Sequence, residues 1–182
     1  MLKRAALVGA MALLVSSTVF AQGMSTDAQI FVKVARAVVT YPRFTVFDNV
    51  NGSIDHGVVT LTGEVTMPFK ATDIARRVSK VPGVVAVRNE IKTLPVSFFD
   101  DQLRYEIARA IYGNSAFWQY ASMPNPPIHI IVDHGRVTLT GVVNNDVERA
   151  LARSLASSFD AFSVTNHLKT DAEMRAALEK LN

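Results

Sequence analysis

The chain has 182 residues, of which 49% are hydrophobic and 19% are charged, a balance typical of globular rather than disordered proteins. It contains no cysteine, which excludes disulfide bonds, thiol chemistry and a lipid-modified cysteine. The formal net charge is +3 for the whole chain but only +1 beyond residue 21, so the composition gives little support to a nucleic-acid partner.

The first 21 residues have the pattern of a secretory signal peptide. Lys3 and Arg4 precede an uncharged, mostly apolar run from Ala5 to Phe20, and small residues stand at the positions expected for cleavage after Ala21. A membrane anchor is the alternative, but the run is shorter than the roughly 20 apolar residues that span a bilayer. The sequence therefore predicts export across a membrane.

The rest of the chain carries the same pattern twice. His56-Gly-Val-Val-Thr-Leu-Thr-Gly63 and His134-Gly-Arg-Val-Thr-Leu-Thr-Gly141 are identical at seven of eight positions, with an offset of 78. Flanking segments match at offsets of 73 and 77, so the elements keep their order while the loops between them differ in length. We expect two copies of one module, residues 27–95 and 99–171, and a C-terminal helix over residues 172–182.

Each copy is expected to begin with a helix, because apolar residues recur there at helical spacing. Asp27 and Asp100 lie near the two helix starts and are expected to cap them. An antiparallel pair of strands follows, joined by a His-Gly turn that needs positive φ. The strands are predicted at residues 50–55 and 58–63 in the first copy, and at residues 128–133 and 136–141 in the second.

A second helix and a third strand complete each copy. The helices are expected at about residues 69–80 and 144–157, the latter with Val147, Leu151 and Leu155 on its inner face. They return the chain to a strand parallel to its neighbour, at about residues 84–92 and 162–169. The predicted fold class is α+β, with two tandem modules in which two helices cover one face of a three-stranded mixed sheet.

Four glycines of the hairpins are expected to be structural. Gly57 and Gly135 stand in the turns, whereas Gly63 and Gly141 end a strand, where a missing side chain lets the backbone bend or the next helix approach. A phosphate-binding loop is the functional alternative, but no glycine-rich run accompanies them.

The hairpin motif, followed by a helix and then by Gly83-Val-Val-Ala-Val-Arg-Asn89, resembles the pattern of BON domains, here in tandem. The second copy keeps only Val164-Thr-Asn166 of the latter part and has Ser157-Ser-Phe-Asp160 where the glycine would be. A signal peptide before two such domains is similar to osmotically inducible periplasmic proteins of Gram-negative bacteria. The resemblance implies binding of phospholipid or envelope proteins without catalytic chemistry, and a structural Gly83.

No pattern for catalysis or metal binding is apparent. The four histidines, at positions 56, 129, 134 and 167, include no pair with ligand-like spacing on one helix. Asp100 and Asp101 are adjacent at a helix start, where capping explains them more simply than acid and base roles. We therefore expect neither a catalytic site nor a metal or cofactor, and a protein that is not an enzyme.

Two surfaces are candidates for binding. The first consists of basic residues that recur on the second helix of both copies: Lys70, Arg76, Arg77 and Lys80, then Arg149 and Arg153. A solvated helix face explains each stripe alone, but recurrence favours an anionic headgroup. The second surface is an aromatic segment with Phe117, Trp118 and Tyr120, which suits a membrane or protein interface or fills the core.

The basic stripes and the resemblance together favour a periplasmic protein that binds anionic phospholipid or the membrane surface. A role in envelope maintenance or osmotic stress is what the resemblance implies. A periplasmic chaperone or scaffold, holding envelope proteins through sheet edges or apolar loops, is the alternative. The sequence leaves open the headgroup, the client and the oligomeric state.

Overall fold

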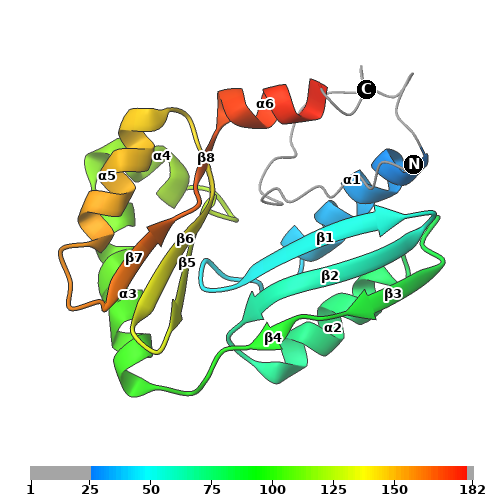
Figure 1. Cartoon of the computed structure of the whole chain (residues 1–182), viewed down its shortest axis with the longest axis horizontal. Coiled ribbons are helices and arrows are strands. Elements are labelled where there is room, and N and C mark those ends of the chain that lie inside the picture. The colour runs from blue at the N-terminus through cyan, green and yellow to red at the C-terminus, as the bar shows by residue number, and fades with distance from the viewer. Residues whose placement is uncertain (1–25, 180–182) are drawn as a thin grey trace.

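The computed structural model describes residues 26–179 (Figure 1). The expected signal peptide, residues 1–21, and the last residues of the expected C-terminal helix lie outside this range. Within residues 26–179, no helix is long and apolar enough to cross a membrane.

The first module contains one mixed sheet and two helices. The sheet order is β1-β2-β3, with β1 antiparallel to β2, and both β3 and β4 parallel to β2. The elements are α1 (Thr26–Val39), β1 (Asn49–Asp55), β2 (Val58–Val65), α2 (Pro68–Val78), β3 (Ala86–Asn89) and β4 (Lys92–Thr93).

The second module repeats this order, with extra helical turns before its first strand. Its sheet order is β5-β6-β7, and β8 also pairs in parallel with β6. The elements are α3 (Phe98–Tyr112), the 3₁₀ helix η1 (Ser115–Phe117), α4 (Trp118–Ala121), β5 (Ile128–Asp133), β6 (Arg136–Val143), α5 (Asp146–Ala156), β7 (Ser163–Asn166), β8 (Lys169–Thr170) and α6 (Asp171–Glu179). The predicted α+β fold class is confirmed, and Figure 1 shows the two sheets, each covered by its own helices.

The third strand of each module is divided into two short strands by an asparagine of the repeated motif. The Asn89 side-chain amide donates to the Ala71 carbonyl of α2 at 3.1 Å, and its side-chain oxygen accepts from the Ile91 N–H at 3.3 Å. Asn166 makes the matching bonds, to the Arg149 carbonyl at 2.9 Å and from the Leu168 N–H at 3.1 Å. Each asparagine therefore ties the strand break to the second helix.

Each module has its own apolar core between helices and sheet. Val34, Val59 and Ile74 are fully buried in the first core, and Ile107 and Leu139 in the second. Alternate residues of β2 and β6 point into these cores, as the sequence pattern predicts.

Val147 was predicted to face inward, and this prediction is wrong. Its side chain is 76% exposed, whereas Ala152 and Ala156 are fully buried. Leu151 and Leu155 are half-buried against the core, so the inner face of α5 is rotated toward Ala152 and away from Val147, which lies in the first turn.

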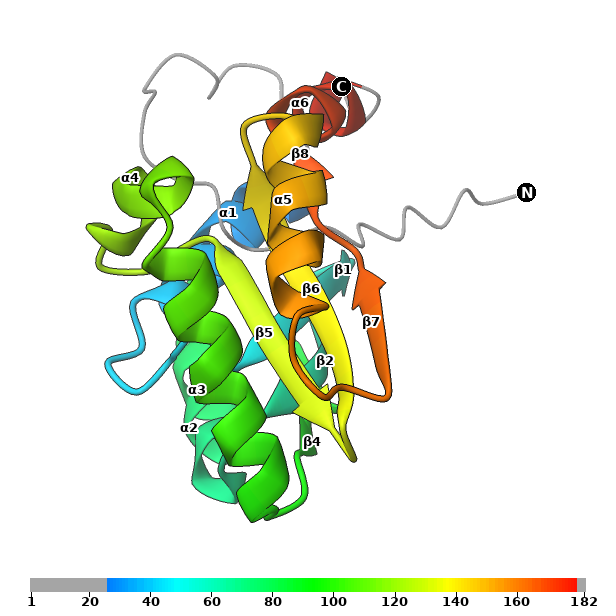
Figure 2. The same ribbon diagram turned by 90° about the vertical axis from the view of Figure 1, so that its left-hand side faces the viewer.

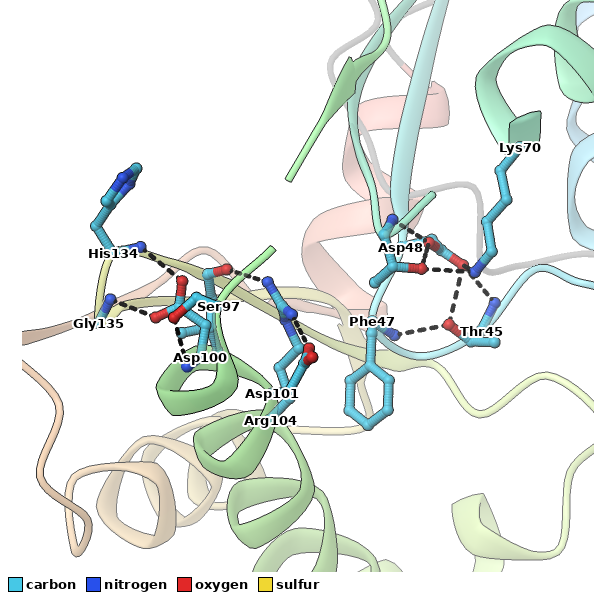
Figure 3. Close-up of polar contacts among 12 residues, drawn as sticks. Thr45, Phe47, Asp48, Lys70, Ser97, Asp100, Asp101, Arg104, His134 and Gly135 are labelled. Carbon is cyan, nitrogen blue, oxygen red and sulfur yellow. Dashed lines mark hydrogen bonds and ion pairs between the residues drawn. The ribbon is translucent and has the colours of Figure 1, made fainter. Parts of the chain in front are cut away.

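Asp27 and Asp100 connect the first helix of each module to the hairpin turn. The Asp100 carboxylate accepts from the N–H groups of His134 at 3.0 Å and Gly135 at 2.7 Å, whereas Ser97 caps α3 (Figure 3). Asp27 accepts from the same two turn positions of the first module, both at 3.0 Å. The expected helix-capping role of Asp100 is therefore corrected: its side chain satisfies turn amides instead.

The turn conformation explains why these amides need an acceptor. His56 and His134 have φ of 49° and 50°, and the glycines that follow them have φ of 78° and 72°. Two successive residues with positive φ form a tight hairpin turn whose N–H groups point away from the ladder. A carboxylate facing them compensates for the hydrogen bonds that the turn cannot make within the sheet.

The two modules touch through the loop of residues 40–48, between α1 and β1. The Val46 carbonyl accepts from the Ile130 N–H of β5 at 2.7 Å. Phe47 packs against the second core, with its ring 5.2 Å from that of Tyr105.

Candidate binding groove

Lys70 was predicted to belong to a basic surface, and this prediction is wrong. Its side chain is 7% exposed, and its ammonium group lies 2.6 Å from the fully buried Asp48 carboxylate (Figure 3). Asp48 also accepts from the backbone N–H and hydroxyl groups of Thr45 and Thr66, at 2.8 to 3.0 Å. Lys70 therefore closes a buried polar network that holds the loop before β1 against the end of β2.

The other basic residues near α2 do not form one binding face either. Arg77 is half-buried and donates to the Ala37 carbonyl of α1 at 3.0 Å and to the Thr40 hydroxyl at 3.2 Å. Arg76 is exposed and pairs with Asp73 at 3.1 Å, and Lys80 is exposed. Figure 1 shows that α2 and α5 lie on different sheets, so the two stripes do not merge into one surface.

The aromatic segment before β5 is mainly part of the core. Phe117 is fully buried, Tyr120 is 4% exposed and Trp118 is 66% exposed. The Tyr120 hydroxyl donates to the Glu148 carboxylate of α5 at 2.5 Å, and burial followed by this hydrogen bond raises the pKa of the Tyr120 phenol. The surface interpretation is therefore corrected for Phe117 and Tyr120, and only Trp118 is available to a partner.

Arg149 and Arg153, in contrast, line an open groove between the two modules. The groove has a volume of about 1030 Å³. One wall is α5, which faces the viewer in Figure 2 beside β7 and β8, and Asn49 and Asn51 of β1 contribute from the first module. The remaining lining residues are Thr140, Gly141, Asp146, Ala150, Ser154, Ser157, Asn166, His167, Leu168 and Lys169.

The basic residues of this groove differ in how strongly they are already paired. Arg149 forms ion pairs with Asp146 and, at 2.8 Å, with Glu173 of α6. Hydrogen bonding to Glu173 raises the pKa of the Arg149 guanidinium, and the Thr170 backbone N–H followed by Arg149 lowers the pKa of the Glu173 carboxyl. Arg149 is therefore largely neutralised by its neighbours.

Arg153 and Lys169 are the basic groove residues without an ion pair among the described residues, and the charge of Lys169 contributes to lowering the pKa of the Glu173 carboxyl. Both side chains are exposed, and neither forms an ion pair within residues 26–179. They come from α5 and β8, which pack against each other. The groove therefore offers these two cations beside neutral amides and hydroxyls, and its Asp146 carboxylate is paired with Arg149.

The sequence analysis missed an exposed apolar patch at the hairpin-turn end of the second module. Val96 is 98% exposed, Phe98 86% and Phe162 78%, and the partly exposed Phe99 ring lies 6.5 Å from that of Phe162. We call these four residues, three of which are phenylalanines, the aromatic tip. The adjacent pair Phe98-Phe99 could have predicted an exposed apolar side chain, because two adjacent residues at a helix start cannot both face the core.

The glycines and histidines of the motifs have structural positions. All five predicted glycines have positive φ, and Gly63 and Gly141 show the largest values, 109° and 118°. The His56 and His134 rings are exposed and each contacts the preceding aspartate, at 2.7 and 2.6 Å. In the part of the chain that the structure describes, no three metal-ligating side chains come together.

The fold and the groove define a protein made of two repeated α+β modules with a polar surface between them. The chain belongs to the BON domain family, which matches residues 26–95 and 100–172. This family is in general non-catalytic. The two matched ranges confirm the tandem repeat that the hairpin motif predicted, and both copies have the expected order of helices and strands.

Two of the solved structures that are similar to this chain come from Chlamydia trachomatis. One is described as CdsD, a structural protein of the type III secretion system; it is 14% identical, with a TM-score of 0.29, over 83% of this chain and 97% of that chain. Another, the C-terminal domain of CdsD, is 16% identical, with a TM-score of 0.28, over 67% of this chain and 56% of that chain. At these values the likeness carries no functional inference. No curated protein sequence matches this chain.

Proposed function

We propose that the protein is a non-catalytic periplasmic binding protein that associates with anionic phospholipid surfaces, in envelope maintenance or osmotic stress. The observation that carries this proposal is the pair Arg153 and Lys169, two exposed and unpaired basic side chains on adjacent elements of the second module. The predicted signal peptide and the BON family support the periplasmic location.

The magnitude of this attraction indicates reversible binding. Each basic group near an anionic membrane contributes about 1 kcal/mol, so Arg153 and Lys169 together supply about 2 kcal/mol. Attraction of this kind is screened within about 10 Å at an ionic strength of 0.1 M. The proposed association is therefore weak and sensitive to salt.

Co-sedimentation with vesicles tests the proposal. The chain without its predicted signal peptide, residues 22–182, contains every helix and strand described above. It should be retained by anionic vesicles at low salt, released at high salt, and not retained by zwitterionic vesicles. Replacing both Arg153 and Lys169 by glutamate should abolish retention, because the charge of the groove is reversed.

The matched control is the double variant Arg109→Glu with Lys80→Glu, which makes the same change in net charge at two exposed positions outside the groove. If both variants lose retention equally, the attraction is a property of net charge alone and the site is wrong. Absence of retention at every salt concentration and lipid composition would exclude lipid binding altogether.

The aromatic tip favours the second candidate function, a periplasmic chaperone or scaffold. Clustered exposed apolar side chains mark sites of protein contact. This function predicts that the protein keeps an unfolded client in solution without dependence on salt or lipid charge. Light scattering by a thermally unfolded client should then rise when Phe98 and Phe162 are replaced by serine, whereas Trp118→Ser, which changes an exposed ring outside the tip, should have no effect.

A further inference from the structure

The walls of the groove differ in chemistry. On the α5 side lie the two unpaired cations, Arg153 and Lys169. On the β1 side lie the amides of Asn49 and Asn51, which alternate with the buried Val50 and Gly52 and therefore stand on the face of β1 opposite its core. A ligand that fills the groove meets charge on one side and neutral hydrogen-bonding groups on the other.

The residue types of the lining favour a polar ligand over an apolar one. Sites for such ligands are lined mainly by hydrophobic and aromatic side chains. Here the described lining contains no Phe, Tyr or Trp, and its apolar side chains are Ala150 and Leu168, the second of them only 2% exposed. The groove is therefore suited to a polar, anionic ligand.

The two unpaired cations match a phosphate group. A phosphate monoester carries a charge of about −1.5 to −2 at pH 7, close to the charge that Arg153 and Lys169 present together. Arginine donates two parallel hydrogen bonds to phosphate oxygens, and lysine adds a point charge. Arg149 adds little, because Asp146 and Glu173 already occupy its guanidinium group.

The asparagines match hydroxyl groups. A side-chain amide both donates and accepts hydrogen bonds, as a hydroxyl does, so two amides two residues apart can hold neighbouring hydroxyls of a polyol. Neither Asn49 nor Asn51 has a side-chain hydrogen bond within residues 26–179, so their amides are available to a ligand.

We propose that the groove binds a phosphorylated polyol, with the phosphate at Arg153 and Lys169 and the hydroxyls at Asn49 and Asn51. The inference rests on the proposed function in one respect: the headgroup of a glycerol-based phospholipid is one source of this chemistry, and a free polyol phosphate is the other. It goes beyond that function because it needs both modules. The bond from Ile130 to the Val46 carbonyl holds β1 of the first module near the second, which carries α5.

Isothermal titration calorimetry of residues 22–182 at low salt tests the site directly. The probes are glycerol 3-phosphate, inorganic phosphate and glycerol. Glycerol 3-phosphate should bind about tenfold more tightly than inorganic phosphate, as expected for one or two added hydrogen bonds, and glycerol should show no binding. Equal affinity for glycerol 3-phosphate and inorganic phosphate would overturn the proposal.

Three single variants locate the site. Arg153→Ala and Asn51→Asp should each weaken glycerol 3-phosphate binding about tenfold, because the first removes a cation and the second places a negative charge in the groove. Arg109→Ala, the matched control, should bind like the unaltered protein. Near-ultraviolet circular dichroism checks that Asn51→Asp keeps its tertiary packing. If folded Asn51→Asp and Arg153→Ala both bind like the unaltered protein, the groove is not the site.

Vesicles containing phosphatidylglycerol distinguish the two sources. Release of the protein from vesicles by glycerol 3-phosphate, together with weaker retention of Asn51→Asp, supports the lipid headgroup as the ligand. Tight binding of soluble glycerol 3-phosphate without any vesicle retention supports a free polyol phosphate, so the groove proposal stands and the membrane function fails. Vesicle retention with no binding of glycerol 3-phosphate leaves the membrane function standing and overturns the groove proposal.

Discussion

Replacing Lys70 by methionine tests the buried network that joins the loop before β1 to α2. The Asp48 carboxylate is fully buried and accepts five hydrogen bonds, one from Lys70 and four from Thr45 and Thr66. Removing one partner of a buried ion pair typically costs about 3–5 kcal/mol, because the other charge stays buried. The four threonine bonds remain, so we expect the lower end, a loss of about 3 kcal/mol in the free energy of unfolding.

Urea denaturation followed by circular dichroism measures this loss. The control is Lys80→Met, an exposed lysine, which should change the free energy of unfolding by no more than about 0.5 kcal/mol. The double variant Asp48→Asn with Lys70→Met should be less destabilised than the sum of the two single variants, because neither then leaves an unpaired charge. A loss of less than about 1 kcal/mol for Lys70→Met would refute the reasoning, because the ion pair would then add little to the threonine bonds.

Three further predictions concern the repeated hairpin and the contact between the modules. Asp100→Ala should lower the free energy of unfolding by about 2–3 kcal/mol in urea, because two turn amides lose a charged acceptor, and Asp27→Ala should cost less because Asp27 is more exposed; equal costs would contradict this. Gly141→Ala should cost about 3 kcal/mol or more in thermal unfolding, because its φ is 118° and an added Cβ would overlap the Pro127 carbonyl; an unchanged melting temperature would exclude the strain. Desolvation lowers the pKa of the His129 imidazole below 6.5 in the folded state, so the unfolded chain takes up a proton first as the pH falls. The contribution of neutral His129 to stability is therefore fully present above the unfolded pKa of 6.5 and is lost as the pH falls below it. The urea midpoint of His129→Gln should therefore depend less on pH between pH 7.5 and pH 5 than that of the unaltered protein. An unchanged pH dependence would show that His129 is not the titrating group.

The sequence was sufficient for the fold because its signals are local. The His-Gly pairs require a turn with positive φ, and alternation along residues 58–63 and 136–141 selects one buried face, so the hairpins and their register follow directly. Asn89 and Asn166 were recognisable in the sequence as the last residues of the repeated pattern. Their role in dividing the third strand could not be predicted, because it depends on hydrogen bonds to the second helix of each module.

The sequence was a poor guide where a side chain's partner lies far away in the chain. Lys70 falls on the same helical stripe as Arg77, which suggested an exposed basic face, but its partner Asp48 lies 22 residues earlier, in a loop without periodicity. Val147 shows a related error, because the inner face of α5 is set by the two small residues Ala152 and Ala156. The groove could not be predicted, since Asn51 and Arg153 come together only through the placement of one module against the other.

The contact between Val46 and Ile130 also bears on how the second module avoids association with other chains. β5 is the edge strand of its sheet, and its outward N–H at Ile130 is satisfied by the loop of the first module. An uncovered edge is a template for pairing with another chain. In the tandem protein that template is partly blocked in cis, so a second module produced alone would expose both this edge and the apolar surface that Phe47 covers. The duplication thus covers part of one sheet edge within the same chain, at a position that an isolated second module would leave open to a partner strand.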